Sequence, residues 1–209
     1  MKSYLLKWTG IVALAFAGAG AWAQEGADSG AAVKVTKIPT LTQVKQKTPA
    51  NFNAGVPPSR AKEWGVFDVE FDVKVDAKQQ QPWVDEMSAT FYVLMQNPKD
   101  AKQPYSFFQL TSRYRDIEKG KSKVSAILIP AAMSRFGNII GLAVELSVGG
   151  KVVDTSDVKS GDLTNRKEWW KDSAVTDGEK TVKRTGYLLD RSKTPFGLVG
   201  YDDYEVEIQ

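Results

Sequence analysis

The chain contains no histidine and no cysteine among its 209 residues. The absence of cysteine excludes disulfides, thiol nucleophiles and thiolate metal sites. The absence of histidine removes the commonest general base and the commonest metal ligand. We therefore expect no metal site, no cofactor and no catalytic residues, and the usual enzyme classes are disfavoured.

Long apolar runs are also missing after the first 23 residues. Lys2 and Lys7 precede a short apolar stretch, residues 10–20, and Ala21-Trp22-Ala23 fits an A-x-A cleavage site. This order is typical of a secretory signal peptide, and the stretch is too short to span a bilayer. The sequence predicts an exported chain that begins at Gln24 and works in the periplasm or on the outer cell surface. It is not expected to be an integral membrane protein.

An excess of charge of either sign is likewise missing. The chain carries 28 basic and 25 acidic residues, and two of the lysines lie in the predicted signal peptide. The mature chain is therefore almost neutral and creates no strong field for nucleic acid or an anionic membrane. No nucleic-acid partner is expected.

The remaining chain is predicted to consist of two parts. Residues 24–58 are polar and rich in glycine, proline and lysine, which predicts a flexible N-terminal arm that could be mobile or pair with another chain. Residues 59–209 contain several short strand patterns separated by turn signals, with one or two short helices between them. The expected fold is all-β: an antiparallel β-sandwich, immunoglobulin-like, over residues 59–209.

The clearest strand pattern lies at residues 67–75. Phe67, Val69, Phe71, Val73 and Val75 alternate with polar residues, which predicts that these five side chains share one buried face.

Turn signals suggest how neighbouring strands connect. Residues 91–95 are apolar on both faces, which indicates a central strand. Residues 105–115 and 121–129 are expected to form a hairpin, and Gly149-Gly150 predicts a second one. Between them, residues 130–138 should form a helical turn that carries the chain from one sheet to the other.

Four groups of residues are candidate sites. Adjacent Trp169 and Trp170 fall in a predicted short helix, residues 163–172, where both cannot face the core, so one could be exposed and stack on a sugar or pack on a partner. The basic side chains of one hairpin could meet an anionic ligand: Lys119, Lys121, Lys123, Arg113 and Arg115. The acidic row Asp68, Glu70 and Asp72 could bind calcium or pair with lysines across the sheet. The doublets Asp85-Glu86 and Asp202-Asp203 could form a carboxylate pair for glycoside hydrolysis.

Several segments resemble a known family. They are residues 63–71, 82–86, 194–196 and 201–204. Together they are similar to a family of secreted immunoglobulin-like envelope proteins encoded beside type IV pilus assembly genes in gut-mucus bacteria. The similarity spans residues 59–209. It implies an envelope or surface protein linked to pilus machinery and supplies no catalytic residues.

These observations lead to three function hypotheses. The first is a non-catalytic envelope protein that binds or assembles with an envelope or pilus-assembly protein, or with itself. The alternative is a glycan-binding module that uses exposed tryptophans. A carboxylate-dependent hydrolase is the third.

Overall fold

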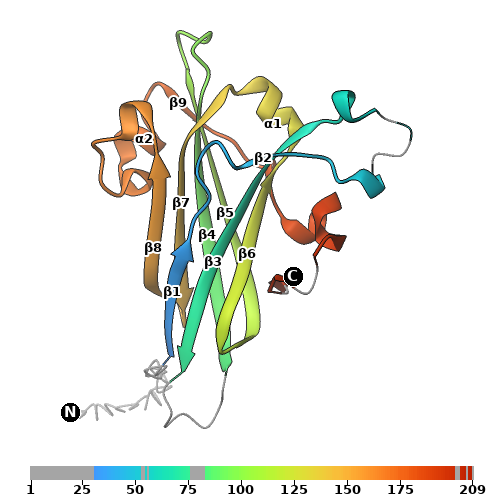
Figure 1. The fold of residues 1–209 in the computed structure, drawn as a ribbon. Coiled ribbons are helices and arrows are strands. Elements are labelled where there is room, and N and C mark those ends of the chain that lie inside the picture. The colour runs from blue at the N-terminus through green and yellow to red at the C-terminus, as the bar shows by residue number, and fades with distance from the viewer. Residues whose placement is uncertain are drawn as a thin grey trace, which may run out of the picture.

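The computed structural model describes residues 31–52, 55, 57–75, 83–200, 203–205 and 207–208 (Figure 1). The predicted signal peptide, the start of the predicted arm and Asp202 lie outside these residues. Within them the chain forms two β-sheets that pack face to face, with two short α-helices and several 3₁₀ turns. The predicted antiparallel β-sandwich is confirmed.

Sheet A contains β1 (Ala31–Lys37), β3 (Glu63–Val75), β6 (Gly120–Leu128) and β10 (Leu188–Asp190) in that order, and β2 (Lys45–Lys47) also pairs with β3. Sheet B has the order β11 (Glu207–Ile208), β5 (Tyr105–Glu118), β4 (Trp83–Gln96), β7 (Asn138–Val148) and β8 (Lys151–Lys159). The short β9 (Thr181–Lys183) runs parallel to β5. The other pairings in both sheets are antiparallel.

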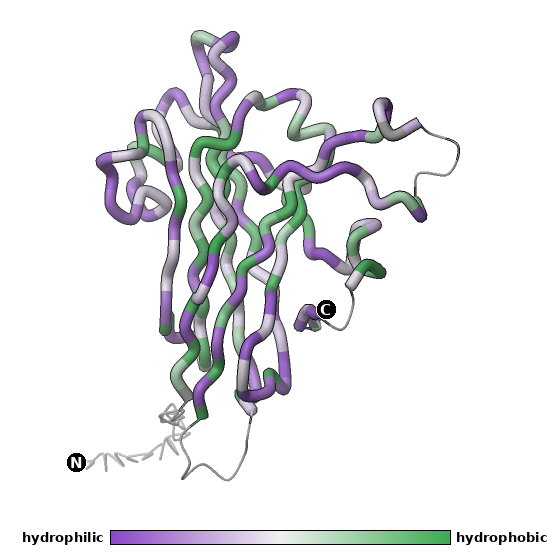
Figure 2. The backbone as a smooth tube through the Cα atoms, in the orientation of Figure 1, coloured by the Kyte–Doolittle hydropathy of each residue, from purple (hydrophilic) through white to green (hydrophobic). Residues whose placement is uncertain are grey.

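Regular alternation places the core between the sheets. Phe67, Val69, Phe71 and Val73 of β3 are almost completely buried, as predicted, and Val75 is half-buried at the end of the strand. Hydrophobic residues recur along the strands in both layers (Figure 2). The outward-facing residues of β3 are mostly polar, so a shift of one residue in register would bury carboxylates.

Two connections have the predicted form. β7 and β8 form an antiparallel hairpin in which Gly149 and Gly150 both have positive φ, as a type I′ turn requires. The helix α1 (Pro130–Arg135) carries the chain from β6 in sheet A to β7 in sheet B. Proline at its first turn suits a helix start, because the missing N–H would have no partner there.

The expected hairpin between residues 105–115 and 121–129 is wrong. β5 pairs with β4 in sheet B, whereas β6 pairs with β3 in sheet A. The chain therefore changes sheets at this turn, where Asp116 and Gly120 have positive φ. Both strands bury their apolar residues in the same core from opposite sides, which a turn signal in the sequence does not reveal.

The expectation of a free arm is also wrong for residues 31–47. β1 pairs antiparallel with β3 from Ala31 opposite Val75 to Lys37 opposite Glu70, and β2 pairs with the start of β3. Val33 and Val44 are buried in the sandwich core. The lysines that made this stretch look like a loose arm are exposed to solvent beside these buried valines.

Polar contacts join the two sheets at both open sides of the sandwich. On one side the backbone N–H of Val35 in β1 donates to the Asp154 carboxylate of β8 at 2.7 Å. On the other side Ser112 of β5 donates to Asp190 of β10 at 2.6 Å. On each side, a carboxylate of one sheet thus accepts a hydrogen bond from the other sheet.

One excursion leaves the sandwich and returns to cover the outer face of sheet B. It comprises η3 (Gly161–Leu163), η4 (Trp169–Lys171) and α2 (Ser173–Thr176), and it lies beside β8 in Figure 1. We call residues 161–176 the outer cap. The remaining short turns are η1 (Ala50–Phe52), η2 (Pro58–Arg60), η5 (Arg191–Lys193) and η6 (Pro195–Leu198).

Candidate functional site

The outer cap forms a second, smaller hydrophobic cluster with sheet B. Leu94 of β4, Phe107 of β5 and Ile140 of β7 point away from the main core and are covered by cap residues. This second layer explains why β4 and β7 are apolar on both faces, since each lies between two hydrophobic clusters. The cap side chains in the cluster are Leu163, Trp169, Trp170 and Val175.

Both tryptophans of the cap are buried, which corrects the expectation that one is exposed. Trp169 has 0% and Trp170 has 6% of its surface accessible. The segment is a 3₁₀ turn preceded by Glu168 at φ 42°, and this geometry lets adjacent residues both face the sheet. Trp170 stacks on Tyr92 with ring centroids 6.4 Å apart. Neither indole is available as a stacking surface for a sugar.

A buried carboxylate holds the cap in place. The Glu145 carboxylate, on the outer face of β7, accepts hydrogen bonds from Tyr92 Oη at 2.8 Å and from Trp170 Nε1 at 3.1 Å. Lys171 Nζ lies 3.1 Å from the same carboxylate and also pairs with Glu168 at 2.7 Å. The cap is therefore attached through two donors, Trp170 and Lys171, which converge with Tyr92 of β4 on one side chain.

The electrostatics of this network keep Glu145 ionised. Burial alone would raise the pKa of the Glu145 carboxyl, but the hydrogen bonds from Trp170, Tyr92 and Lys171 outweigh it and lower the pKa below its ordinary value. Burial, together with the bond to Glu145, raises the pKa of the Tyr92 phenol, which stays a donor. The network is thus a fixed structural contact at neutral pH.

Glycine makes the close approach of the cap possible. A Cβ on Gly141 of β7 would lie 2.6 Å from Leu163 Cδ1 and 2.9 Å from Trp169 Cζ2, so no larger residue fits without moving the cap. The Asp172 side chain accepts from the N–H of Ala174 at 2.9 Å and begins α2. These local features position the walls of the pocket that lies beside the cap.

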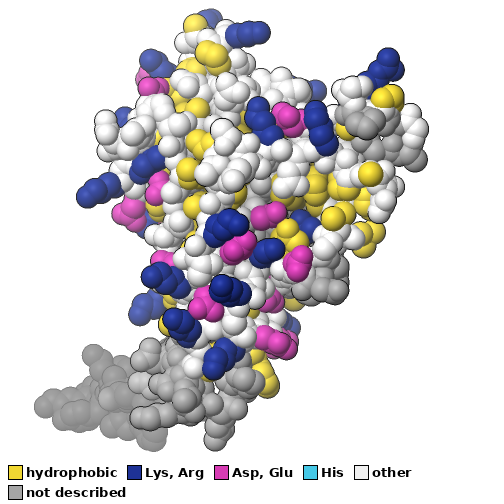
Figure 3. Space-filling model, viewed as in Figure 1, with side chains coloured by type: hydrophobic (Ala, Val, Ile, Leu, Met, Phe, Trp, Pro, Cys, Tyr) yellow, Lys and Arg dark blue, Asp and Glu magenta, His cyan; other side chains and the backbone are white. Residues whose placement is uncertain are grey.

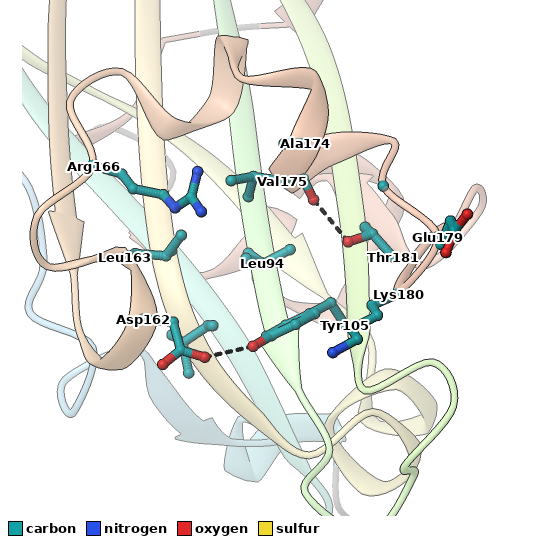
Figure 4. A pocket seen from close by; sticks show the side chains of 12 residues that line it. Leu94, Tyr105, Asp162, Leu163, Arg166, Ala174, Val175, Glu179, Lys180 and Thr181 are labelled. Carbon is teal, nitrogen blue, oxygen red and sulfur yellow. Dashed lines mark hydrogen bonds between the residues drawn. The ribbon is translucent and has the colours of Figure 1, made fainter.

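The pocket has a volume of about 290 Å³ and opens between the cap and the β5–β9 edge of sheet B (Figure 4). Its apolar surface comes from four different elements and consists of Leu94, Ile140, Leu163 and Val175. Ala174 and Gly178 complete the side formed by α2 and the turn after it. The pocket therefore rests on the second hydrophobic cluster.

Polar groups line the opening. Tyr105 Oη donates to Asp162 at 2.5 Å, and Thr181 Oγ1 donates to the carbonyl of Val175 at 2.8 Å, as Figure 4 shows. The bond to Asp162, with burial, raises the pKa of the Tyr105 phenol, which therefore remains neutral. Arg166 points over the pocket and pairs with Asp172 at 2.6 Å. Glu179 and Lys180 are exposed at the rim.

The basic residues of the expected patch lie on two different sheets. Arg113 and Arg115 are exposed on β5 of sheet B, while Lys121 and Lys123 lie on β6 of sheet A. Lys119 is exposed at the turn between them. Arg115 stands opposite Glu86, and Lys121 stands opposite Asp72. The structure does not bring these side chains together as one anion-binding site.

The acidic row of β3 pairs across sheet A as expected for a solvated face. Asp72 lies between Lys34 and Lys121 in register, and Glu70 pairs with Lys37 at 3.2 Å. Figure 3 shows acidic and basic side chains interspersed where β1, β3 and β6 run. Asp68 instead accepts from Ser125 at 2.8 Å and from Tyr204 at 3.0 Å.

The other candidates are not assembled into a site by the described residues. Among these residues, no three acidic side chains lie close enough to hold a metal ion. Asp85 accepts from the indole of Trp83 at 3.0 Å, and Asp202 lies outside the described range. No helix in the described part of the chain is long and apolar enough to cross a membrane.

The pocket itself was not predicted from the sequence. Two signals pointed toward it: the apolar residues on both faces of residues 91–95, and the paired tryptophans that later cover them. Their combination indicates a layer over the outside of a sheet. The polar residues at the pocket rim could not be predicted from the sequence, because isolated charges in a loop are also typical of solvated loops without a binding role.

The fold and the pocket define an antiparallel β-sandwich protein with a capped outer face. A protein-family model matches residues 27–209, and the chain belongs to that family. The crystal structure of a protein from Akkermansia muciniphila has the same fold, with a TM-score of 0.67 at 21% identity, covering 86% of this chain and 94% of that one. No curated protein matches the chain significantly.

Proposed function

We propose that this protein is an exported, non-catalytic binding module of the cell envelope, and that the pocket beside the outer cap is its recognition site. The observation that carries the proposal is a formed pocket in which several of the lining polar groups are already paired within the protein. Tyr105 is bonded to Asp162, Arg166 to Asp172, and Thr181 to a backbone carbonyl. Such groups orient a ligand, whereas nucleophilic catalysis requires an activated nucleophile beside a base.

The predicted signal peptide at residues 1–23 supports a location outside the cytoplasm. A module held together by its hydrophobic core, with no disulfides, can fold in the periplasm or on the cell surface. The similarity to envelope proteins encoded beside type IV pilus assembly genes directs the proposal to a partner in pilus-like machinery. The partner is an envelope or pilus-assembly protein, or a second copy of this chain.

The glycan-binding alternative is no longer favoured. Its two named candidates, Trp169 and Trp170, are both buried, so it would need another exposed aromatic side chain.

Export and partner binding can be tested in cells of the source organism. Fractionation followed by N-terminal sequencing is expected to give a mature protein that begins at Gln24 outside the cytoplasm. A chain with Leu14→Arg, which breaks the apolar stretch, should stay inside. An intact leader on a cytoplasmic protein would contradict the proposed location.

A photo-crosslinking residue at Lys180, on the pocket rim, then tests the partner. We expect crosslinks to a defined envelope or pilus-assembly protein, or to a second copy. The matched control carries the same residue at Lys119, which is exposed on a turn outside the pocket. Equal crosslinking from both positions would contradict a recognition role for the pocket.

A further inference from the structure

The size of the pocket limits what can occupy it. Its volume of about 290 Å³ lies just below the ~300–1,000 Å³ typical of small-molecule sites. It accepts one large side chain or a molecule of similar size. Because its deepest surface is made of Leu94, Ile140, Leu163 and Val175, the inserted group must be apolar.

The charges around the opening indicate the rest of the occupant. Asp162 and Arg166 are each engaged by a neighbour, by Tyr105 and by Asp172 respectively. Glu179 and Lys180 remain at the rim, one of each sign and both exposed. A rim with balanced charge has no preference for a strongly charged ligand, and it offers both donors and acceptors. This is the complement of a neutral peptide backbone.

The pocket is also formed before any ligand arrives. Gly141 lets Leu163 and Trp169 rest directly on β7, and Glu145 holds Trp170 and Lys171. A pocket with fixed walls loses little conformational entropy when a side chain enters. This favours recognition of one anchor residue by shape.

We propose that the pocket binds one large aliphatic or aromatic side chain, of the size of leucine or phenylalanine, presented by an uncharged segment of the partner protein. This inference rests on the proposed function and specifies which chemical group of the partner binds in the recognition site. The anchor side chain fills the apolar surface, and the flanking peptide groups lie against the rim at Glu179 and Lys180.

Small blocked amino acids test this with the intact mature protein. N-acetyl-leucinamide carries the side chain with neutral groups at both ends. It is compared with N-acetyl-alaninamide, with N-acetyl-leucine and with leucinamide by ¹H–¹⁵N NMR titration. N-acetyl-leucinamide is expected to shift the amide signals of Gly178, Lys180 and Thr181 at millimolar concentration. The alanine analogue should bind at least about tenfold more weakly, since the lost methylene groups contribute most of the contact.

Two matched variants locate the binding. Ala174 is exposed and lines the pocket, so Ala174→Tyr blocks the opening without disturbing the core. Ser173→Tyr places the same side chain on the neighbouring exposed residue, which does not line the pocket. The first variant should weaken binding at least about tenfold, and the second should leave it within about twofold of the unmodified protein.

The remaining outcomes overturn the proposal. Tighter binding of N-acetyl-leucine or of leucinamide would show that a peptide terminus or another charged ligand is recognised. Equal binding of the alanine analogue, no shift at the pocket, or binding unaffected by Ala174→Tyr would exclude an apolar anchor here. Failure of the crosslinking experiment with intact amide binding would instead refute the cellular partner and leave the pocket chemistry standing.

Discussion

At the scale of single residues, Glu145 connects the outer cap to the sandwich. Its carboxylate accepts hydrogen bonds from Tyr92 and Trp170 and forms an ion pair with Lys171, all within 3.1 Å. The residue is 8% exposed. A buried carboxylate is unfavourable unless donors compensate for its lost hydration, and here they do. The same compensation makes the residue hard to replace.

Glu145→Gln is expected to lower the free energy of unfolding by about 2 kcal/mol, because a neutral amide cannot accept from three donors. Urea denaturation followed by tryptophan fluorescence measures the change. Glu70→Gln is the matched control, since Glu70 forms an exposed ion pair with Lys37 and should cost less than about 1 kcal/mol. If both variants lose the same free energy of unfolding, the buried network stabilises the protein no more than the exposed ion pair does.

This contribution has a defined pH dependence. The pKa of Glu145 lies below its ordinary value of 4.5 in the folded protein, so its stabilisation is complete above the pKa of the unfolded chain. It is lost as the pH falls through the lower, folded pKa. The difference in stability between the unmodified protein and Glu145→Gln should therefore be constant above about pH 5 and shrink below about pH 4. A difference that grows on acidification would contradict the assignment.

The comparison uses the difference between the two proteins because Glu205, whose pKa is raised by burial, is present in both and its effect on stability cancels.

At the scale of elements, Gly141 shows how a strand and the cap depend on one another. Its φ is not in the positive region that favours glycine, so Gly141→Ala introduces no backbone strain and tests only the steric effect of the added methyl group. The added methyl group would meet Leu163 and Trp169, and we expect a loss of about 1–3 kcal/mol together with a changed near-ultraviolet circular dichroism of the tryptophans. Ser147→Ala on the same strand should change neither quantity. An unchanged spectrum in Gly141→Ala would mean that the cap does not rest on β7.

The N-terminal strands are a second test at this scale. A chain that begins at Ser59 lacks β1 and β2, and with them the buried Val33 and Val44. It should lose at least about 3 kcal/mol, the value expected for burying two valine side chains. A chain that begins at Ala31 keeps both strands and is the control in thermal melting. If the two chains melt alike, these strands add no stability.

The sequence reveals some of these elements better than others. Alternation at residues 67–75 predicted the core face of β3, and Gly149-Gly150 predicted the β7–β8 turn, because each pattern depends on local geometry. The pairing of β6 with β3 could not be predicted, since turn chemistry does not say to which sheet the next strand belongs. The strands β1 and β2 were not predicted, because an edge strand buries few residues and the exposed Lys34, Lys37 and Lys45 made the stretch look like a polar arm. The pocket combines four elements distant in sequence, and its position depends on their packing.

At the scale of the whole molecule, sheet B separates the two largest of the three hydrophobic clusters that the described residues form. The larger lies between the sheets and the smaller lies beneath the cap. The smaller cluster can open without exposing the larger one, because its attachment is confined to residues 161–176 and the outer face of sheet B. The molecule should therefore have a local opening of lower free energy than global unfolding.

Hydrogen exchange followed by mass spectrometry tests this arrangement. Amides of residues 161–176 should exchange faster than those of β3 and β4, and Glu145→Gln should speed exchange in the cap while leaving β3 unchanged. Phe71→Ala, which removes a buried side chain of the main core, is the contrasting variant and should speed exchange in both regions. Uniform acceleration by Glu145→Gln would show that cap and sandwich unfold as one unit.

The contact between Val35 and Asp154 has a consequence for which substitutions the fold tolerates. The donor is a backbone N–H, which every residue except proline provides, whereas the acceptor is a side chain. Position 35 should therefore accept many half-buried residues but reject proline, while position 154 should accept few residues without a short side-chain acceptor. A saturation library of both positions, sorted for folded protein, is expected to show this asymmetry. One seam of the sandwich is thus specified by the side chain of only one of its two strands.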